Sequence, residues 1–347
     1  MAVHIADLER AIAKQHEKSP FSGVIWVKEQ SKIVFAKSYG FANRSEAIPN
    51  TLNTRFATAS GTKTFTSAAI CQLVEKNLLT FDTLLKDCLS IPFSTFDPAI
   101  SVHHLLTHSS GIPDYFDEAG MDDYEDLWKE RPMYSVRSLE NFLPMFQDRA
   151  MEFAPGEKFA YNNAGYILLG LIVEQVSKLC FQEYVEANIF AVCNMADSGF
   201  FAMDCLPPCT AYGYIQKSDR EWRTNFYALP VIGGSDGGAF TTIGDMEKFW
   251  QALMTHQLLS ETILKQMLTP YISTGKQGRN GASIYYGYGL WIAQQGEALF
   301  YHMFGGDPGV SFYSGMYPDR DIQITLMGNI VNPFTDMRDC IMTFYHA

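Results

Sequence analysis

A serine and a lysine three residues apart stand at the start of an apolar helical stretch. In RFATASGTKTFTSAAICQLVEKNLL, residues 55–79, Ser60 and Lys63 precede residues suited to burial. Residues i and i+3 project from the same face of a helix. A serine hydroxyl becomes an effective nucleophile when a base takes its proton, and a lysine can be that base when burial and nearby positive charge lower its pKa. The pair therefore has the types and the spacing for acyl-transfer chemistry.

The start of a helix favours this chemistry further. The helix dipole places partial positive charge there, and the first backbone N–H groups can hold a developing oxyanion. The alternative is structural: Ser60 caps the helix, and Lys63 is an exposed helical residue. Other parts of the chain have to decide between the two.

Two later segments carry residue types that would complete such a site. FAPGEKFAYNNAGYILLG places Tyr161 and Asn163 just before an apolar helix, and HMFGGDPGVSFYSGMYPD places Gly305 and Gly306 between a first predicted strand and a second. The order S-x-x-K, Y-x-N and glycine-bearing strand resembles the serine β-lactamase-like hydrolases. The closest likeness is to class C β-lactamases, D-alanyl-D-alanine carboxypeptidases and the related esterases.

The resemblance covers nearly the whole chain. LLTHSSGIPDY is similar to the family's L-L-T-H-T-S-G-[IL] segment, GGAFTTIGDMEKF to its G-G-[LM]-x-S-T-x-x-D run, and YGYGLWI to its Y-G-[LY]-G-W. It implies that Ser60 is acylated, that Lys63 helps to take its proton, and that Tyr161 acts as base and relays the proton to the leaving group. Asn163 would hold the substrate carbonyl or the lysine. The backbone N–H groups of Ser60 and Gly306 would form the oxyanion hole, and no cofactor or metal is implied.

The glycine-bearing strand departs from the family pattern. Where the family has Lys-Thr-Gly or His-x-Gly, alignment on GGDPG places Met303, Phe304 and Gly305. His302 stands one residue too early, so strand alternation turns it away from the cleft unless a bulge corrects the register. If such a bulge is present, His302 faces the cleft, and it therefore stays a candidate substrate-binding residue. Loss of the cation that meets a substrate carboxylate shifts the expected substrates toward esters, amides or peptides without a carboxylate at that point.

Two other residues offer rival chemistry. Ser235 in GGSDG, residues 233–237, fits G-x-S-x-G, the nucleophile elbow of α/β-hydrolases. That motif needs a strand directly before the serine and a helix directly after it, whereas Gly238 and AFTT follow here and the next helix is expected near Thr242. The glycines better fit a loop beside the cleft. His108 in LLTHSSG stands where the family has a structural histidine, so a buried, hydrogen-bonded role is favoured over that of a general base.

Charge limits the partners of the chain. A net charge of −12 argues against nucleic acid, whose phosphates require Lys/Arg patches, and against an anionic membrane surface. DYFDEAGMDDYEDLWKE, residues 114–130, holds eight acidic residues and one lysine. It is either a solvated surface segment or an acidic wall near the cleft that attracts cationic substrates. Asp114 and Tyr115 are expected at the mouth of the cleft.

Cysteines and apolar runs bear on the compartment. Seven cysteines are scattered without a paired framework, and several lie in apolar helical runs, which favours buried thiols in a reducing compartment. Cys205 and Cys209 in CLPPC lack a third and a fourth ligand at suitable spacing, so no metal site is expected. No apolar run approaches the roughly 20 residues of a membrane span, and the N-terminus has the pattern of an amphipathic helix, not of a signal peptide. A cytoplasmic location is therefore expected, and the oligomeric state stays open.

The elements that position the candidate residues come from both ends of the chain. SGVIWVKE and KIVFAKSYG predict a hairpin near the N-terminus, and strand patterns return near the C-terminus in SIYYGYGLWIAQ, ALFYHMF, GVSFYSGMYP and DIQITLMGN. The fold class is therefore α/β (α+β): one antiparallel sheet built from both ends, covered by terminal helices, with a mostly helical region inserted. Residues 1–80 and 265–347 are expected to form the sheet region and residues 81–264 the helical region, with the cleft between them.

These patterns together predict a serine hydrolase that acts through an acyl-enzyme. The expected substrates are esters, amides or small peptides, including peptides with D-residues, and a small molecule or peptide is the only partner expected. One alternative is a β-lactamase or D,D-carboxypeptidase. Another is a non-catalytic or slowly turning over protein of the penicillin-binding or sensor kind.

Overall fold

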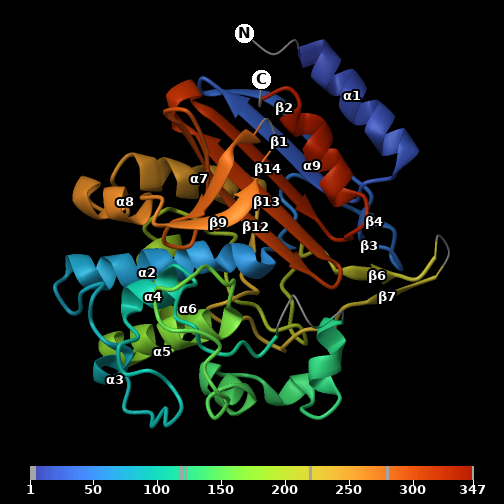
Figure 1. Cartoon of the computed structure of the whole chain (residues 1–347). Helices are drawn as coiled ribbons and strands as arrows, with labels where there is room; N and C mark the ends of the chain where they lie inside the picture. The colour runs from blue at the N-terminus through green and yellow to red at the C-terminus, as the bar shows by residue number, and fades with distance from the viewer. Residues whose placement is uncertain (1–4, 117–120, 122, 219–220, 279–280, 346–347) are drawn as a thin grey trace.

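An antiparallel eight-stranded sheet with the order β2-β1-β14-β13-β12-β11-β10-β9 forms the centre of the molecule (Figure 1). The structure is a computed structural model and describes residues 5–116, 121, 123–218, 221–278 and 281–345. The first strand pairs with the last, from Gly23 opposite Gly328 to Glu29 opposite Ile322. The strands of the sheet are β1 (Gly23–Glu29), β2 (Lys32–Tyr39), β9 (Ile272–Gln277), β10 (Ser283–Tyr286), β11 (Trp291–Gln295), β12 (Ala298–Asp307), β13 (Val310–Tyr317) and β14 (Ile322–Gly328).

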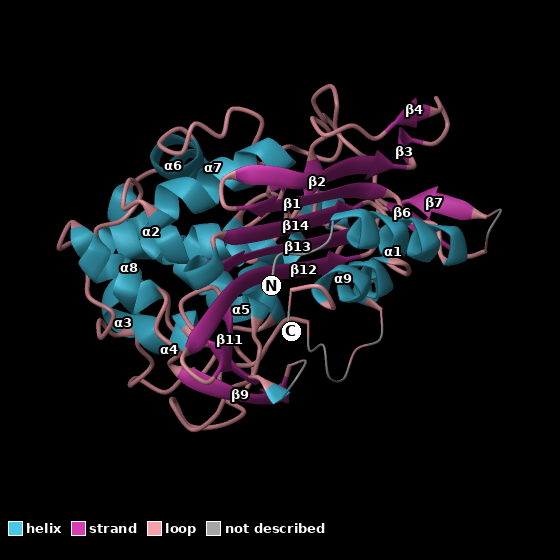
Figure 2. Ribbon diagram, turned by 90° about the horizontal axis from the view of Figure 1, so that it is seen from above, coloured by secondary structure: helices cyan, strands magenta, loops and turns pink. Residues whose placement is uncertain are grey.

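Helices from the two ends of the chain cover one face of this sheet. α1 (Ile5–Lys18) and α9 (Phe334–Met342) contact each other and lie across it (Figure 2). Successive residues of β1 point to opposite faces: Ile25 packs in the layer beneath these helices, whereas Val24 and Trp26 pack in the opposite layer. Because both faces of the strand are covered, its sequence is apolar almost without interruption.

A mostly helical region packs on the opposite face of the sheet. Its longest helix, α5, contacts α2, and both helices are buried on every side along most of their length. A helix that is apolar all round has to be enclosed by other elements. The helices of this layer are α2 (Lys63–Glu75), α3 (Leu85–Cys88), α4 (Val102–Leu106), α5 (Asn163–Ser177), α6 (Phe181–Val185), α7 (Ile243–Met254) and α8 (Glu261–Met267).

Short elements complete the fold. The three small strand pairs are β3 (Phe41–Asn43) with β4 (Ile48–Pro49), β5 (Phe56–Ala57) with β8 (Phe240–Thr241), and β6 (Tyr214–Gln216) with β7 (Trp222–Thr224). The short helical turns are η1 (Ala59–Thr62), η2 (Tyr124–Trp128), η3 (Met133–Ser135), η4 (Leu139–Met145), η5 (Glu186–Phe190) and η7 (Pro318–Arg320).

The architecture confirms the fold class predicted from the sequence, an α+β arrangement whose antiparallel sheet is built from both chain ends. The division at residues 80/81 and 264/265 stays a prediction, and its second bound falls inside α8. Among the described residues, no single helix has the length and apolar character to cross a membrane. The helical segments 163–177 and 181–190 pass that test only as a pair, bent by 76°.

Candidate active site

The turn η1 brings Ser60 to the seam between the helices and β12. Ala59, directly before it, has a φ of 45°, in the left-handed region that side-chain-bearing residues seldom adopt. Gly305 on β12 packs against this turn so closely that a Cβ at this position would lie 2.0 Å from the carbonyl oxygen of Thr58. Only glycine allows this approach. It places the next residue, Gly306, beside the serine, and both line one cavity.

Lys63, the first residue of α2, is enclosed and bonded to three acceptors. Lys63 is 1% exposed. Nζ donates to Ser60 Oγ at 3.1 Å, to Asn163 Oδ1 at 2.7 Å and to the backbone oxygen of Asp236 at 2.7 Å. An ammonium group would donate all three bonds, whereas a neutral amine would donate to Asn163 and Asp236 and accept the proton of the Ser60 hydroxyl. The structural alternative for the pair is excluded, because Lys63 is not exposed and the cap of α2 is Thr62, not Ser60.

Tyr161 lies over the lysine. Its ring centroid is 4.9 Å from Lys63 Nζ, a distance at which the ring face attracts a cation. The ring stacks on Trp291 of β11, with centroids 5.9 Å apart, and packs against His108 at 4.4 Å. Aromatic neighbours on both strand and loop therefore hold the Tyr161 ring beside the lysine.

Asn163 begins α5 and joins the lysine to a buried carboxylate. Its Oδ1 accepts from Lys63, while its backbone N–H and its Nδ2 donate to Asp114 Oδ2 at 2.9 and 3.1 Å. The expectation that Asp114 lines the cleft mouth is wrong, because it is 5% exposed and lies beneath the helix start instead of on the cavity wall. Tyr115 does line the cavity. Sequence analysis missed the contact of Asp114 with Asn163, for which its place three residues after the T-H-S-S-G turn was the only signal.

His108 has the buried, hydrogen-bonded position favoured from the sequence. It is 1% exposed, and its Nδ1 accepts from the backbone N–H of Asn162 at 3.0 Å, so the proton of the neutral ring is on Nε2. Burial, followed by the nearby charge of Lys63, lowers its pKa well below the ordinary value for histidine. A neutral ring in this place supports Tyr161 and the start of α5.

Ser235 is excluded as a nucleophile by its surroundings. It is fully buried, and its Oγ lies so near Gly170 of α5 that a Cβ there would come within 2.2 Å of it. The helix that follows, α7, begins only at Ile243. The neighbour of Ser235 makes the contacts with the lysine: the backbone oxygen of Asp236 accepts from Lys63, and its side chain accepts from the hydroxyl of Tyr115.

The register of β12 decides between His302 and Met303. Pairing with β13 is continuous from Tyr301 opposite Met316 to Asp307 opposite Val310, without a bulge. His302 therefore points to the α9 side of the sheet, where its ring stacks on Phe300 at 5.2 Å. The substrate-binding role expected for the His302 side chain is corrected accordingly. Met303 points to the helical side, but it is 1% exposed within the core and does not line the cavity.

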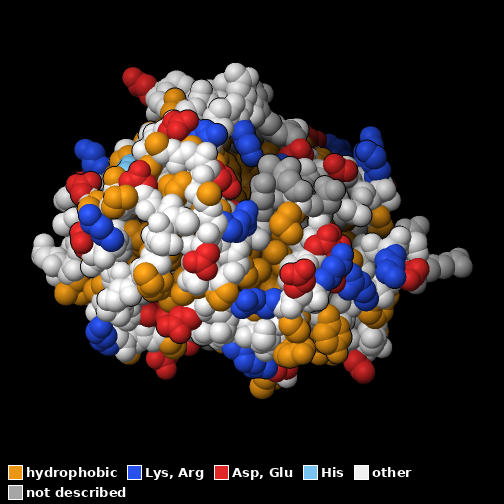
Figure 3. All heavy atoms as spheres, turned by 60° about the horizontal axis from the view of Figure 1, so that its bottom comes forward, with side chains coloured by type: hydrophobic (Ala, Val, Ile, Leu, Met, Phe, Trp, Pro, Cys, Tyr) orange, Lys and Arg blue, Asp and Glu red, His pale blue; other side chains and the backbone are white. Residues whose placement is uncertain are grey.

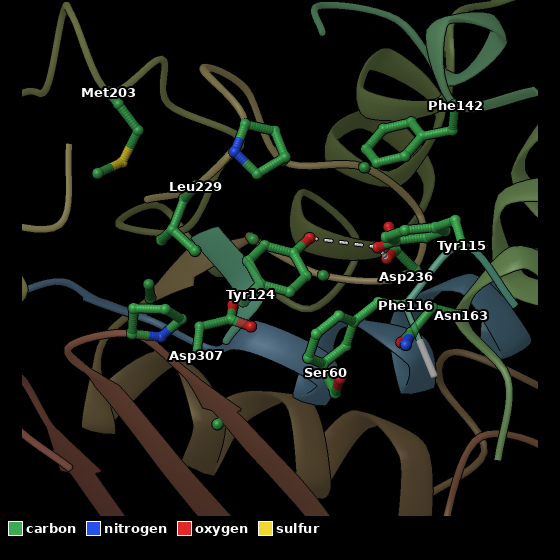
Figure 4. A pocket seen from close by; sticks show the side chains of 18 of the residues that line it. Ser60, Tyr115, Phe116, Tyr124, Phe142, Asn163, Met203, Leu229, Asp236 and Asp307 are labelled. Atoms are coloured by element: carbon green, nitrogen blue, oxygen red, sulfur yellow. Dashed lines mark hydrogen bonds between the residues drawn. The ribbon is translucent and has the colours of Figure 1, made fainter. Parts of the chain in front are cut away.

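The cavity at this seam has a volume of about 380 Å³, a size typical of small-ligand sites. Figure 4 shows Ser60 and Asn163 at its floor and Tyr115, Tyr124 and Phe116 along one side. Other walls are apolar, formed by Phe142, Phe201, Met203, Leu229 and Phe240. The cavity thus combines the Ser60 hydroxyl with a largely apolar space.

Negative charge gathers on the cavity wall. Asp123, Asp236 and Asp307 line it, and among its described lining residues there is no lysine or arginine. Burial raises the pKa of the Asp236 carboxyl, and the charge of Lys63 and the hydrogen bond from Tyr115 oppose that rise. A hydroxyl of Tyr124 lies 3.3 Å from that of Tyr115, so the two phenols extend the polar chain from Asp236 into the cavity (Figure 4).

The acidic segment 114–130 divides between this cavity and the outer surface. Asp123 is exposed and lines the cavity, whereas Glu125 pairs with Arg223. Figure 3 shows acidic and basic side chains interspersed over the face that bears the helical region. Surface charges of this segment are therefore partly balanced. Residues 117–120 and 122 of the segment lie outside the described residues.

Both the sequence and the structure resemble those of known proteins. The family model described as Beta-lactamase matches residues 8–342. The solved structure of a penicillin binding protein from Bacillus halodurans is 51% identical, with a TM-score of 0.90 over 96% of this chain and 99% of that one. Penicillin-binding protein 4* of Bacillus subtilis is 26% identical over 94% of this chain and 71% of its own. The D-amino acid amidase from Ochrobactrum anthropi SV3 shares the fold, with 21% identity and a TM-score of 0.78 over 98% of this chain and 99% of that one. The resemblance inferred from the motifs is confirmed, and the chain belongs to the beta-lactamase family.

Proposed function

We propose that this protein is a serine hydrolase that acts through an acyl-enzyme on esters, amides or small peptides, including peptides with D-residues. The observation that carries the proposal is the buried Lys63, which holds Ser60 Oγ and Asn163 Oδ1 at the wall of a cavity. Burying an ammonium group is costly. A chemical role for Lys63 accounts for that cost better than a structural one.

The geometry supports acylation of Ser60 in the following steps. Ser60 Oγ attacks the substrate carbonyl carbon, and the serine proton passes to the Lys63–Tyr161 pair, which lies within reach of it. The backbone N–H groups of Ser60 and Gly306 stabilise the oxyanion. The bond to the leaving group then breaks, and the leaving group takes the proton.

Deacylation follows the same path. Water adds to the acyl carbon and gives its proton to the Lys63–Tyr161 pair, and the pair returns that proton to Ser60 Oγ as the bond to the acyl group breaks, which releases the acid and restores the serine. A protonated Lys63 has no lone pair with which to accept the serine proton. Tyr161, over its ammonium, is therefore our candidate for the group that accepts the serine proton first.

The cavity supports a preference for neutral or cationic substrates. Its lining holds three aspartates and, among the described residues, no lysine or arginine. The position that carries a cation in the family is Met303, which is buried in the core. A substrate carboxylate would therefore meet negative charge without a counter-charge on the wall. Amide substrates with D-residues fit a fold that the D-amino acid amidase also has.

A second candidate is penicillin acylation with slow turnover. It is favoured by the 51% identity to a structure described as a penicillin binding protein. The two candidates share the acylation of Ser60 and differ in the rate of deacylation. Penicillins carry a carboxylate, so the charge of the cavity weighs against tight binding.

The test combines intact-protein mass spectrometry with a substrate panel. Wild type and Ser60→Ala are treated with a fluorophosphonate and with a penicillin, and turnover is measured on p-nitrophenyl esters, D-amino-acid amides and nitrocefin. We expect a fluorophosphonate adduct on wild type only, ester or amide turnover, and weak nitrocefin hydrolysis. A lasting penicillin adduct without ester turnover would favour the second candidate, and no adduct at Ser60 would refute both.

A further inference from the structure

One buried carboxylate determines which way the side-chain amide of Asn163 points. Asp114 Oδ2 accepts from the backbone N–H of Asn163 at 2.9 Å and from its Nδ2 at 3.1 Å, and Asp114 Oδ1 accepts from the backbone N–H of Ala164 at 2.9 Å. The remaining polar atom of the amide, Oδ1, accepts from Lys63 Nζ at 2.7 Å. Asp114 is thus the far end of a chain that leads through Asn163 and Lys63 to Ser60.

The chemistry of the two ends permits only one orientation of the amide. An ionised carboxylate only accepts hydrogen bonds, and an ammonium only donates them. The Nδ2 group therefore faces Asp114 and Oδ1 faces Lys63. The reverse orientation would place donor against donor at Lys63 and acceptor against acceptor at Asp114, and buried polar groups without partners are costly.

We propose that Asp114 is a positioning residue of the hydrolase: its carboxylate fixes the Asn163 amide so that Lys63 is held beside Ser60, and its protonation releases that hold. The inference rests on the function proposed above. It concerns the same site, to which Asp114 adds pH control without touching the substrate.

Charged and titratable groups from every adjoining element face Asp114. Lys63 lies on α2 and Asp236 on the loop before β8. Tyr115 and Tyr124 lie on the segment that follows Asp114 itself in the chain. The guanidinium of Arg149 donates to the backbone oxygen of Asp114 at 2.5 Å, not to its carboxylate.

These groups place the titration of Asp114 in the neutral range. Burial raises the pKa of its carboxyl to about 7, against the hydrogen bonds from Asn163 and Ala164 and the charge of Lys63, which lower it, while the charge of Asp236 adds to the rise. Above this pH the carboxylate accepts the three N–H groups. Below it, a protonated carboxyl has a donor of its own and holds the amide less firmly. Activity limited by this contact therefore rises with pH through about 7.

The decisive variant is Asp114→Asn, which keeps size and shape but has one acceptor oxygen where the carboxylate uses two, so its NH2 group opposes the N–H groups of either Asn163 or Ala164. On a neutral p-nitrophenyl ester, we expect kcat to fall roughly 10²-fold with KM changed less than about threefold, since a misplaced reacting group affects the transition state most. We also expect the acidic limb of the kcat profile near pH 7 to disappear. The double variant Asp114→Asn/Asn163→Asp restores a donor facing an acceptor and an acceptor facing Lys63. It should recover at least about tenfold of the lost kcat.

The matched control is Asn162→Ala at the same helix start. Asn162 caps α5 by accepting from the N–H of Gly165 at 2.7 Å, and its Nδ2 donates to the backbone oxygen of Ile112 at 2.8 Å. Its loss should lower stability while leaving the acidic limb in place. If Asp114→Asn behaves like this control, with the limb retained and no recovery in the double variant, Asp114 has only a structural role and the proposal is overturned.

One further measurement keeps the proposal testable apart from the hydrolase activity. Carbon-13 NMR of aspartate-labelled Ser60→Ala protein follows the Asp114 carboxyl directly, and we expect a titration near pH 7 that is absent when Asp114→Asn is added. A titration complete below about pH 5, near the ordinary value, would overturn the pH control. If wild type shows neither ester turnover nor labelling of Ser60, the proposed function fails while the NMR titration still reports on Asp114. Should Asp114→Asn not fold, Asn163→Asp supplies the second variant, and its added carboxylate should move the acidic limb to higher pH.

Discussion

The two walls that meet at Ser60 are built differently. The helical wall, with Asn163 and Asp236, offers side-chain and backbone acceptors that hold Lys63. The sheet wall, formed by the end of β12 with Gly305 and Gly306, offers its backbone and no cationic side chain. The groups that we propose for acylation thus come from both walls, whereas the described lining of the cavity has no lysine or arginine to meet a substrate carboxylate. Under the proposed function, the helical wall carries the proton path, and the sheet wall lacks the cation that would meet a substrate carboxylate.

Removal of the nucleophile is expected to have the largest effect. Ser60→Ala should lower turnover by roughly 10⁴-fold or more, because the groups of such a site act as a unit. Stability should change little, since Ser60 does not cap α2. Ester kinetics and thermal unfolding of the same preparation check both parts. Ser235→Ala serves as the comparison, and activity lost in that variant but kept in Ser60→Ala would move the site to another serine.

The helical wall can be broken at its proton path. Lys63→Ala and Tyr161→Phe should each lower kcat/KM by roughly 10²–10⁴-fold, the usual contribution of a positioned acid or base. The double variant should be hardly slower than the worse single one, because the two residues serve one transfer. A double-variant cycle on one ester measures this. Losses that multiply would mean that the two residues act independently.

The sheet wall can be tested by charge. A neutral acyl substrate should exceed its carboxylate-bearing counterpart by roughly ten- to a hundredfold in kcat/KM, the value of one charge-assisted hydrogen bond. His302→Ala should leave this ratio unchanged, because the ring stacks on Phe300 on the far face of β12. A wild-type preference for the carboxylate, lost in His302→Ala, would contradict the assigned register.

Met303→Lys would test the same wall by adding the missing cation, but the variant is expected to destabilise the protein. Met303 is 1% exposed in the core, so a lysine there would bury an ammonium without a partner. The variant is expected to lose several kcal/mol of stability before it gains any carboxylate recognition. Urea unfolding gives the loss, and a stable variant with improved carboxylate turnover would show that Met303 can turn toward the cavity.

The smallest predicted effect concerns stability and pH. The pKa of Asp114 is raised from 3.8 to about 7 in the folded protein, so the folded state holds this proton more tightly than the unfolded chain. Its contribution to stability is full below the unfolded value and is lost as pH rises through the folded value, a change on the order of a few kcal/mol. Asp114→Asn should therefore flatten the decline of the free energy of unfolding between about pH 5 and pH 8. Urea unfolding across this range measures it, and equal slopes in the two proteins would contradict the raised pKa.

The sequence predicted what local spacing controls. Ser60 and Lys63 are neighbours on one turn, and period-two alternation along β12 correctly offered the inward place to Met303 and the outward place to His302 in the absence of a bulge. It did not predict the contacts that cross the fold. Asp236 meets Lys63 from 173 residues away, and Asp114 meets Asn163 from 49 residues away. Such contacts depend on how helices pack, and no pattern along the chain encodes that.

Pairing of the first strand with the last also sets the order in which the site can appear during synthesis. β1 has its hydrogen-bonded neighbour on one side only when β14 has left the ribosome, some 300 residues later. Gly306, on β12, likewise reaches Ser60 only after most of the chain has been made. Ser60 is therefore translated early, whereas the site that we propose around it forms late. In ribosome-bound chains that stop before β12, we expect Ser60 not to react with a fluorophosphonate. Late formation of the site would then protect the growing chain from premature acylation.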